Sequence, residues 1–463
     1  MTLWRPAIER FPGPRYLAIA RALAEDAASG ALAGGQRLPT HRQLARRLGV
    51  TVGTVTRAYA EAERLGLISG EVGRGTFVRQ RGGLAQPKPA EDGAAIDLTL
   101  NVWPADPEDG ELLRDTFAAL AKRADTYHLL GYQSHGGALT HREAAAAWIT
   151  RQHRLPVAAD QVILTAGGQH ALCAALSAIF RPGEALAVDH LTWPGIKAVA
   201  ETLNIPVRTV PADAEGMLPD ALAALARSEP VRAVYLMPTL HNPTAATMRE
   251  PRRQALAAAA AASDLMIVED DVYGFLDHNA PAPVAVHAPE RTIFMASTSK
   301  CFGGGLRLGF LAVPDGMVGR TIQAVRSTTW MAPAISAEVA RLWIDTGDAD
   351  RLAERRREKV RQRQQKARAI LGLPRHGGGE MTAMHMWLPV TGRACVSDIV
   401  VDARARGVVL VPPEVFLGSG RGEAPRALRI CLSAPPSDAQ LEQALTTLAG
   451  LIRESASHYL SVV

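Results

Sequence analysis

The sequence lacks the features that mark membrane-embedded, secreted and metal-binding proteins. No stretch of its 463 residues approaches the roughly 20 consecutive apolar residues that a membrane-spanning helix needs. Its first residues, MTLWRPAIERFPGPRY, have charges and prolines where a secretion signal has an apolar core. The cysteines are scattered without metal-binding or redox spacing, so we expect reduced thiols at Cys173, Cys301, Cys395 and Cys431. A cytoplasmic protein with no membrane partner and no metal site is therefore expected.

Lysine is missing from the first 81 residues, which contain thirteen arginines and six acidic residues. This segment carries a net charge of +7, and because the whole chain carries +5, the remainder carries −2. A small basic head on a nearly neutral body predicts a polyanionic partner for the head alone. The length of the chain predicts two or three globular domains.

A helix-turn-helix pattern lies between residues 38 and 66. Thr40 is the expected N-cap of a first helix, Gly49 interrupts it, and a second helix begins near Thr51. Residues 67–78, LISGEVGRGTFV, predict two short strands around a glycine-rich turn. Such a unit places the N-terminal edge of its second helix in the major groove of DNA.

The predicted DNA contacts come from both helices and from the turn between the strands. The second helix would offer its exposed edge to the bases, and the first would bring arginines to the phosphates, which set register. A helical domain that is basic only for solubility is the alternative. The predicted contacts are Thr51, Thr54 and Arg57 at the bases, Arg42 and Arg46 at the phosphates, and Arg74 and Gly75 in the turn.

This head resembles the GntR-family winged helix. In that family LP-x-x-R-x-LA precedes the turn and G-x-GTFV forms the wing, and these motifs occur here at 38–45 and 73–78. The resemblance implies a double-stranded DNA operator as partner. Many members have an arginine directly after the position of Thr51, where this chain has Val52, so its base contacts there must differ.

A linker rich in Pro, Gly and Ala is predicted at 81–96, between a head at 1–80 and a body at 97–463. In the body, short apolar strands alternate with helical patterns. That alternation predicts an α/β fold with a mainly parallel sheet covered by helices on both faces, which binds ligands at the carboxyl ends of its strands. The predicted strands lie in DQVILTAGG, EALAVDH, RAVYLMP, LMIVEDD and TIFMAS.

One stretch of the body, FMASTSKCFGGGLRLGF at 294–310, sets a single lysine between serines and a glycine run. Lys300 precedes Arg307 by seven positions. A bound phosphate would explain this pattern, and so would a surface loop. TAGGQHAL places Gly168 and Gln169 at a strand-to-helix turn, where free amides and the helix dipole favour an anion. Taken alone, such a turn is equally a tight connection.

Further polar or aromatic residues follow the predicted strands. Trp193 offers a flat face at a loop tip, which is by default a packing surface. Asn242 precedes a proline and is by default a turn former. Asp270 and Tyr273, in VEDDVYGF, could face one ligand, or the acids could form a helix N-cap cluster.

In this order the motifs resemble the fold-type I aminotransferases, which have a large and a small subdomain and use pyridoxal 5′-phosphate (PLP). The resemblance implies that Lys300 forms a Schiff base with the cofactor aldehyde. It implies that Asp270 pairs with the protonated pyridine nitrogen and that Trp193 stacks on the ring. Asn242 and Tyr273 would hold the phenolic oxygen.

The same resemblance implies a phosphate site and a carboxylate site. Arginine suits both, because its paired donors match phosphate and carboxylate oxygens. Ala245 stands where the family often has glycine. The phosphate is expected at Ser297, Ser299, Arg307, the amides of Gly168 and Gln169 and, across a subunit interface, Tyr132; the substrate or effector carboxylate is expected at Arg429.

A GntR-type head on an aminotransferase-like body resembles the MocR class of bacterial transcriptional regulators. The resemblance implies a homodimer, often with each head packed on the partner's body, and a small amino compound as effector. In the implied mechanism the effector exchanges with the internal aldimine on Lys300 and alters operator binding. A working aminotransferase with an attached regulatory head and a vitamin B6 sensor are the alternatives.

Residues 351–371 carry nine basic and two acidic residues on a predicted helix. One interpretation is a solvated face on the helix that leads into the small subdomain. The other is a second surface that touches DNA.

Overall fold

The computed structural model of the protein divides into two compact units, residues 1–89 and 90–463. The predicted linker lies outside the described residues as far as position 94. The structure describes residues 4, 6–11, 14–28, 32, 36–64, 67–71, 75–78, 95–374, 379–391, 396–418, 423 and 425–457.

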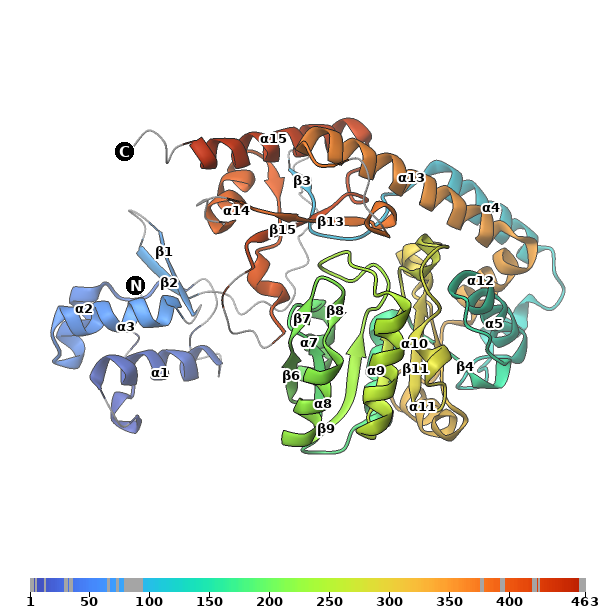
Figure 1. Ribbon diagram of the computed structural model, residues 1–463, viewed down its shortest axis with the longest axis horizontal. Helices are drawn as coiled ribbons and strands as arrows, with labels where there is room; N and C mark the ends of the chain where they lie inside the picture. The colour runs from blue at the N-terminus through green and yellow to red at the C-terminus, as the bar shows by residue number, and fades with distance from the viewer. Residues whose placement is uncertain are drawn as a thin grey trace. The chain divides into compact units, whose positions relative to one another are not determined.

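The first unit is a winged helix-turn-helix, drawn in blue in Figure 1. The Thr40 hydroxyl accepts from the Gln43 amide and begins the first helix of the motif, and Gly49, at φ 63, forms the turn that follows. The predicted motif and wing are confirmed, and a preceding helix that packs on the second motif helix was not predicted. The elements are α1 Arg15–Ala28, α2 His41–Leu48, α3 Val52–Arg64, β1 Ile68–Glu71 and β2 Gly75–Val78.

A seven-stranded sheet forms the centre of the second unit. Its order is β4-β12-β11-β10-β9-β5-β6, and neighbours are parallel except β12, which is antiparallel to both of its neighbours. The five predicted strands are present, while β6 and β12 were not predicted. The strands are β4 Val162–Thr165, β5 Ala185–Asp189, β6 Val207–Val210, β9 Val231–Leu236, β10 Met266–Asp270, β11 Thr292–Ser297 and β12 Gly309–Ala312.

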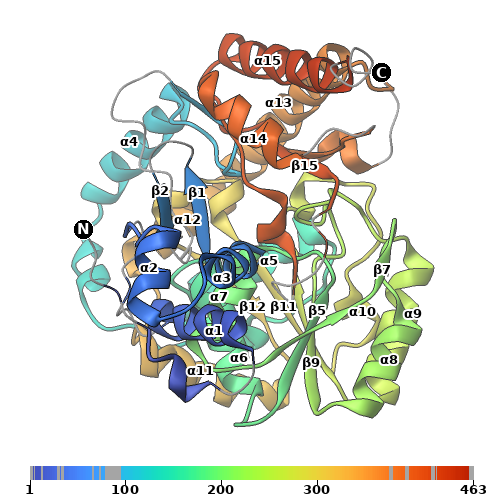
Figure 2. The same ribbon diagram turned by 90° about the vertical axis from the view of Figure 1, so that its left-hand side faces the viewer.

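Both faces of this sheet are covered, as predicted (Figures 1 and 2). Along β5, Leu186 and Val188 enter one core and Ala187 enters the other, as the two-residue period of a strand requires. Helices α8, α9 and α10 fill the core on the Ala187 face, and α5, α6, α7, α11 and α12 fill the opposite core. Their bounds are α5 Leu139–His153, α6 Gly168–Ile179, α7 Pro194–Thr202, α8 Pro219–Ser228, α9 Glu250–Ala262, α10 Val284–His287, α11 Asp315–Thr328 and α12 Ala334–Thr346, with α4 at Pro107–Ala121.

A small subdomain with its own core completes the second unit. Strands β13 and β15 pair antiparallel, and β3, which begins one residue before the predicted start of the body, pairs parallel with β14. Helix α13 runs from α12 to α15 (Figure 1). Among the described residues, no helix is long and apolar enough to cross a bilayer. The elements are β3 Ile96–Asp97, α13 Asp348–Leu371, β13 His385–Pro389, α14 Val396–Ala405, β14 Val408–Val409, β15 Ala427–Cys431 and α15 Asp438–Ser457.

Candidate cofactor and DNA-binding sites

The predicted phosphate residues meet at the carboxyl edge of the sheet. The turn after β4 ends at Gly167, which has φ 92, and α6 begins at Gly168. A Cβ on Gly167 would lie 2.6 Å from Arg307 Nη2, and a Cβ on Gly168 would lie 3.6 Å from Ser297 Cβ. The Ser297 hydroxyl donates to the Ser299 hydroxyl at 3.1 Å. Helix amides, two hydroxyls and a guanidinium form a donor set that fits a phosphate dianion.

We call this donor set the phosphate cradle: Gly167, Gly168, Ser297, Ser299 and Arg307. Lys300 lies beside it, at the end of the short turn Thr298–Lys300 that follows β11. Its Nζ donates to the Asn101 carbonyl oxygen at 2.6 Å and lies 5.9 Å from the centroid of the Tyr273 ring. Burial, helped by the positive charge of Arg429, lowers the pKa of Lys300 to about 8. An amine with this pKa is partly unprotonated near neutral pH and can attack an aldehyde.

Asp270 ends the neighbouring strand β10 and is buried. Its Oδ2 accepts from the Tyr235 hydroxyl at 2.7 Å, and its Oδ1 accepts from the Val272 amide at 3.3 Å. Burial raises the pKa of Asp270 to about 7, although both hydrogen bonds act in the opposite direction. A protonated pyridine nitrogen beside this carboxylate would favour its charged form, so Asp270 fits the role that the resemblance implies.

A buried network that the sequence did not predict lies behind Tyr273. Asn101 Nδ2 is 2.9 Å from Tyr273 Oη and 3.0 Å from His385 Nδ1. His385 Nε2 is 3.0 Å from the His241 carbonyl oxygen. Tyr273 was singled out in the sequence, but its partners Asn101, His385 and His241 were not, and these residues lie so far apart in the chain that only folding brings them together.

Arg429, on β15, is buried and contacts Asn242. Its Nη1 donates to Asn242 Oδ1 at 2.9 Å, its Nη2 donates to the Thr99 carbonyl, and its guanidinium lies 4.8 Å from the Phe416 ring centroid. Its Nε is buried without a hydrogen-bond partner among the described residues. Ala245 adopts φ 58, a left-handed conformation that glycine adopts without steric cost.

Trp193 and Tyr132 occupy different environments. Trp193 precedes α7 and its indole covers Gly195, where an added Cβ would lie 2.2 Å from the indole. The side-chain Nε2 of Gln169 donates to the Gly195 carbonyl oxygen at 3.3 Å. Tyr132 is 86% exposed, and its ring lies 5.9 Å from the Trp330 ring. Its predicted contact across a subunit interface stays a prediction.

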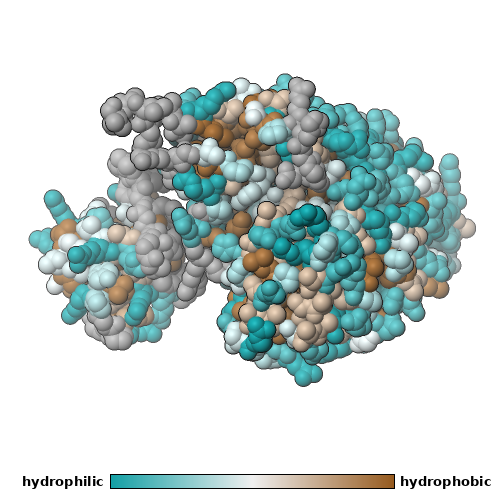
Figure 3. Space-filling view, viewed as in Figure 1, coloured by the Kyte–Doolittle hydropathy of each residue, from teal (hydrophilic) through white to brown (hydrophobic). Residues whose placement is uncertain are grey.

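Helix α13 leads from α12 into the small subdomain and keeps part of its charge exposed, as the first interpretation expects, but several of its arginines are buried. The surface over α4 and α13 is mostly hydrophilic (Figure 3), but beneath it guanidinium groups satisfy backbone carbonyls of both subdomains. The pairs are Arg356 to Cys301, Arg357 to Phe275 and Arg363 to Leu432.

Trp103 connects this helix to the lysine. Its indole Nε1 donates to the Lys300 carbonyl oxygen at 2.8 Å, and the Arg356 guanidinium lies 5.1 Å from the indole ring centroid. The backbone of Lys300 is therefore tied to α13 through one indole ring.

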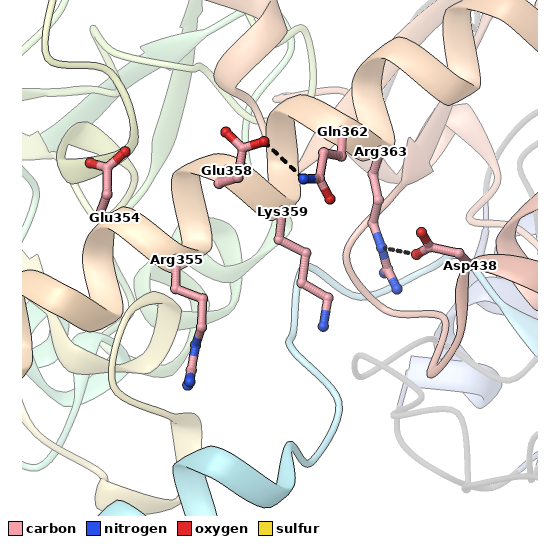
Figure 4. Close-up of a pocket in the computed structure, with 7 residues that line it drawn as sticks. All are labelled: Glu354, Arg355, Glu358, Lys359, Gln362, Arg363 and Asp438. Atoms are coloured by element: carbon pink, nitrogen blue, oxygen red, sulfur yellow. Dashed lines mark hydrogen bonds and ion pairs between the residues drawn. The ribbon is translucent and has the colours of Figure 1, made fainter.

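A charged groove of about 480 Å³ runs along α13 (Figure 4). Its charged groups pair with neighbours: Arg363 bonds Asp438 at 3.1 Å, and Glu358 accepts from Gln362 at 2.8 Å. None of the predicted site residues lines it. The lining residues are Glu354, Arg355, Glu358, Lys359, Gln362, Arg363 and Asp438.

In the head, the predicted base-reading residues gather at the start of α3. The Thr51 hydroxyl accepts from the Thr54 amide at 3.2 Å and lies 2.9 Å from the Thr54 hydroxyl. Thr51 and Arg57 are exposed and Thr54 is half-buried. Arg42 and Arg46, on α2, are exposed. Such exposed cations fit phosphate contacts.

Val52 and Gly75 are also among the described residues of the head. Val52, the first residue of α3, is 44% exposed. Gly75 begins β2 and pairs with Glu71 of β1. Arg74 lies outside the described residues.

Known families match both parts of the chain. The family described as bacterial regulatory proteins, gntR family, matches residues 15–78, and aminotransferase class I and II matches residues 95–448. The uncharacterized HTH-type transcriptional regulator YdeF of Bacillus subtilis is 30% identical over 451 residues, 97% of this chain and 96% of that protein. The chain belongs to this family of bacterial HTH-type transcriptional regulators.

Other members and solved structures agree with this placement. The HTH-type transcriptional regulator TauR of Rhodobacter capsulatus is 30% identical over 434 residues, 85% of this chain and 87% of that protein. A crystal structure of an archaeal alanine:glyoxylate aminotransferase matches with a TM-score of 0.69 and 25% identity, over 78% of this chain and 91% of that one. The GntR head, the fold-type I aminotransferase fold and the resemblance to the MocR class are thereby confirmed.

Proposed function

We propose that this family member is a transcriptional regulator that binds DNA through its head, holds PLP at Lys300, and responds to an amino compound. One observation carries the proposal: the same chain contains a helix-turn-helix with exposed residues at the start of α3 and, in its body, Lys300 with a lowered pKa beside hydrogen-bond donors that fit a phosphate. The HTH-type regulators that it resembles along nearly their whole length support the same interpretation.

Bound PLP supplies an aldehyde that condenses with amines and a ring that withdraws electrons. The chain's residues would orient it. Asp270 would keep the pyridine nitrogen protonated, and Trp193 would cover the ring. Asn242 and Tyr273 would hold the phenolic oxygen. The phosphate would be held by Ser297, Ser299, Arg307 and the amides of Gly168 and Gln169.

The effector is proposed to be an amine that also carries a carboxylate or sulfonate. Arg429 is buried, and its paired donors now face Asn242 and the Thr99 carbonyl. An anionic group of the effector would take over part of these bonds. To regulate DNA binding, the effector must bind two conformations of the protein with unequal affinity.

A homodimer is also part of the proposal. Several large apolar side chains near Tyr132 in sequence or space are exposed: Tyr127 at 66%, Leu130 at 84% and Trp330 at 44%. A second copy would cover such side chains, and Tyr132 could then reach the partner's phosphate site. Two heads would bind paired half-sites on the operator.

In the head, Arg42 and Arg46 would contact phosphates, and Thr51, Thr54 and Arg57 would face the bases. Val52 places an apolar side chain at the same edge. A thymine methyl is the base feature that such a side chain contacts, so we propose a thymine at this position of each half-site.

Reconstitution with PLP tests the cofactor site. The wild-type protein is expected to gain a visible absorbance band, and borohydride is expected to leave a pyridoxyl group on Lys300, detected by peptide mass. Lys300→Ala is expected to lose that adduct, whereas Lys122→Ala, at an exposed lysine after α4, is expected to keep it. A colourless wild-type protein without an adduct contradicts the proposal.

DNA selected from a random pool by the purified protein provides a probe for the head. Arg57→Ala is expected to weaken binding to the selected DNA about tenfold or more. Arg46→Ala is expected to weaken binding to all sequences and to reduce the slope of log binding constant against log salt concentration by about one. Arg21→Ala, at an exposed arginine of α1, is the control. Equal loss in all three variants would indicate a general charge effect.

The two alternatives make different predictions for an amine panel. If an amine shifts DNA affinity and Lys300→Ala abolishes that shift, the effector interpretation holds. Turnover on the order of 10 per second would favour an aminotransferase. A shift caused by PLP alone, unchanged by any amine, would favour a vitamin B6 sensor.

A further inference from the structure

One buried histidine sets the direction of the hydrogen bonds around Asn101. His385 lies on β13, and its Nε2 is 3.0 Å from the His241 carbonyl oxygen. A carbonyl oxygen can only accept, so Nε2 carries a proton. Burial, followed by the charge of Arg429, lowers the pKa of His385 to about 3, and the ring is therefore neutral near pH 7. Nδ1 is then an acceptor.

That acceptor fixes the amide of Asn101. Its Nδ2 lies 3.0 Å from His385 Nδ1 and 2.9 Å from Tyr273 Oη. An amide nitrogen has two hydrogens and only donates, so it donates one to each neighbour. With the amide reversed, Oδ1 would face Nδ1 and two acceptors would be in contact. The Tyr273 oxygen therefore accepts from Asn101, and its own proton points elsewhere.

We infer that His385 is a positioning residue: by holding the Asn101 amide in one orientation, it leaves the Tyr273 hydroxyl proton for the cofactor's phenolic oxygen. The inference rests on the proposed function, which places that oxygen at Tyr273. The link also joins the two subdomains, because His385 belongs to the small subdomain and Tyr273 follows β10 of the large one.

Loss of the acceptor would redirect the proton. Asn101 Oδ1 is buried and has no hydrogen-bond partner among the described residues. If residue 385 offered no acceptor, the amide could reverse, and Oδ1 would accept the Tyr273 proton. The phenolic oxygen would lose a donor that stabilises its anionic form, so its pKa would rise.

Two nearly isosteric variants isolate this effect. His385→Asn keeps an acceptor oxygen that can replace Nδ1, whereas His385→Leu removes it. Both lose the bond to the His241 carbonyl, so that loss cancels in the comparison. The readout is the pKa obtained when PLP-loaded protein is titrated with acid or base and its visible absorbance is followed. His385→Leu is expected to raise it by about one unit, and His385→Asn is expected to leave it near the wild-type value.

The control is a double-mutant cycle with Tyr273→Phe, which removes the proton in question. In that background His385→Leu is expected to cause no further shift. His385→Met fills the same buried volume without a strong acceptor and replaces the leucine variant if that variant does not fold. Equal pKa values for the asparagine and leucine variants would overturn the inference. A wild-type protein that takes up no PLP would instead overturn the proposed function.

Discussion

The phosphate cradle and the network around Asn101 lie in one site but are assembled in different ways. The cradle uses neighbours in sequence, with Gly167 and Gly168 in one turn and Ser297 and Arg307 within eleven positions. The network joins residues separated by 172 and 284 positions. A cradle made from turns is visible in the sequence, whereas a network made from long-range contacts depends on correct packing of both subdomains.

The largest effect is expected at Arg429, whose bonds to Asn242 and the Thr99 carbonyl, like those of the network, join segments far apart in the chain. Arg429→Leu should lower the affinity for an amino acid that the wild-type protein binds by about 100-fold, because a buried charged partner is removed. Titration of the visible absorbance measures it. The amine that lacks the carboxylate is the control and should bind both proteins alike. An equal loss for both amines would show that Arg429 supports packing and does not hold the carboxylate.

A pH effect is expected at Asp270. Its pKa is about 7 when folded and about 3.9 when unfolded, so the folded state binds the extra proton and apoprotein stability falls as pH rises between these values. Between about pH 5.5 and about 7.5 the wild-type apoprotein should lose about 2 kcal/mol more unfolding free energy than Asp270→Asn.

Denaturant unfolding at the two pH values measures this difference. Asp189 and Glu269 also have pKa values raised to about 7 by burial, but they are present in both proteins and cancel. If the two proteins lose the same free energy, the Asp270 carboxyl is already ionised at the lower pH.

A paired glycine substitution tests the cradle. Gly167→Ala puts a Cβ 2.6 Å from Arg307 Nη2 at φ 92, so it should weaken PLP binding about tenfold, or ~1.4 kcal/mol. Gly168→Ala meets Ser297 only at 3.6 Å, an ordinary contact, and should change affinity less than about twofold. Fluorescence titration of the apoprotein measures both. Equal losses would mean that the guanidinium does not hold the phosphate.

The smallest effect is expected at the link to α13. Trp103→Phe removes the bond to the Lys300 carbonyl but keeps an aromatic ring beside Arg356, so unfolding free energy should fall by about 1 kcal/mol. Denaturant unfolding measures the change. Trp330→Phe, at an exposed indole, should stay within about 0.5 kcal/mol of wild type. A similar loss in both variants would mean that the indole bond adds nothing.

Sequence patterns predicted most of the fold and one side of the site. The head was predicted in its helix-turn-helix and wing, because capping residues and a left-handed glycine act within a few positions. The five predicted strands carry apolar runs long enough to recognise. Strands β6 and β12 were missed, since VRTV and GFLA are short and lack a distinguishing pattern.

The charge on α13 did not reveal that several of its arginines are buried, and the reason is physical. A run of arginines usually faces water, but guanidinium groups can also enter an interior that supplies carbonyl acceptors. Arg356, Arg357 and Arg363 do so between two subdomains. The buried arginines share one face of the helix with Leu352, Val360 and Ala367 at helical spacing, but the run does not show which carbonyls accept from them.

Local patterns were enough to predict the parts and their order: a basic winged helix, an α/β body, and a lysine set between serines and an arginine. These follow from local rules, since caps, turns and strand periods act over a few residues. The contacts of Asn101 with Tyr273 and His385, and the burial of several arginines of α13, follow instead from the packing of the folded chain. Those contacts join segments that are distant in the chain. Their strength depends on how deeply the groups are buried, and a short stretch of sequence does not specify that burial.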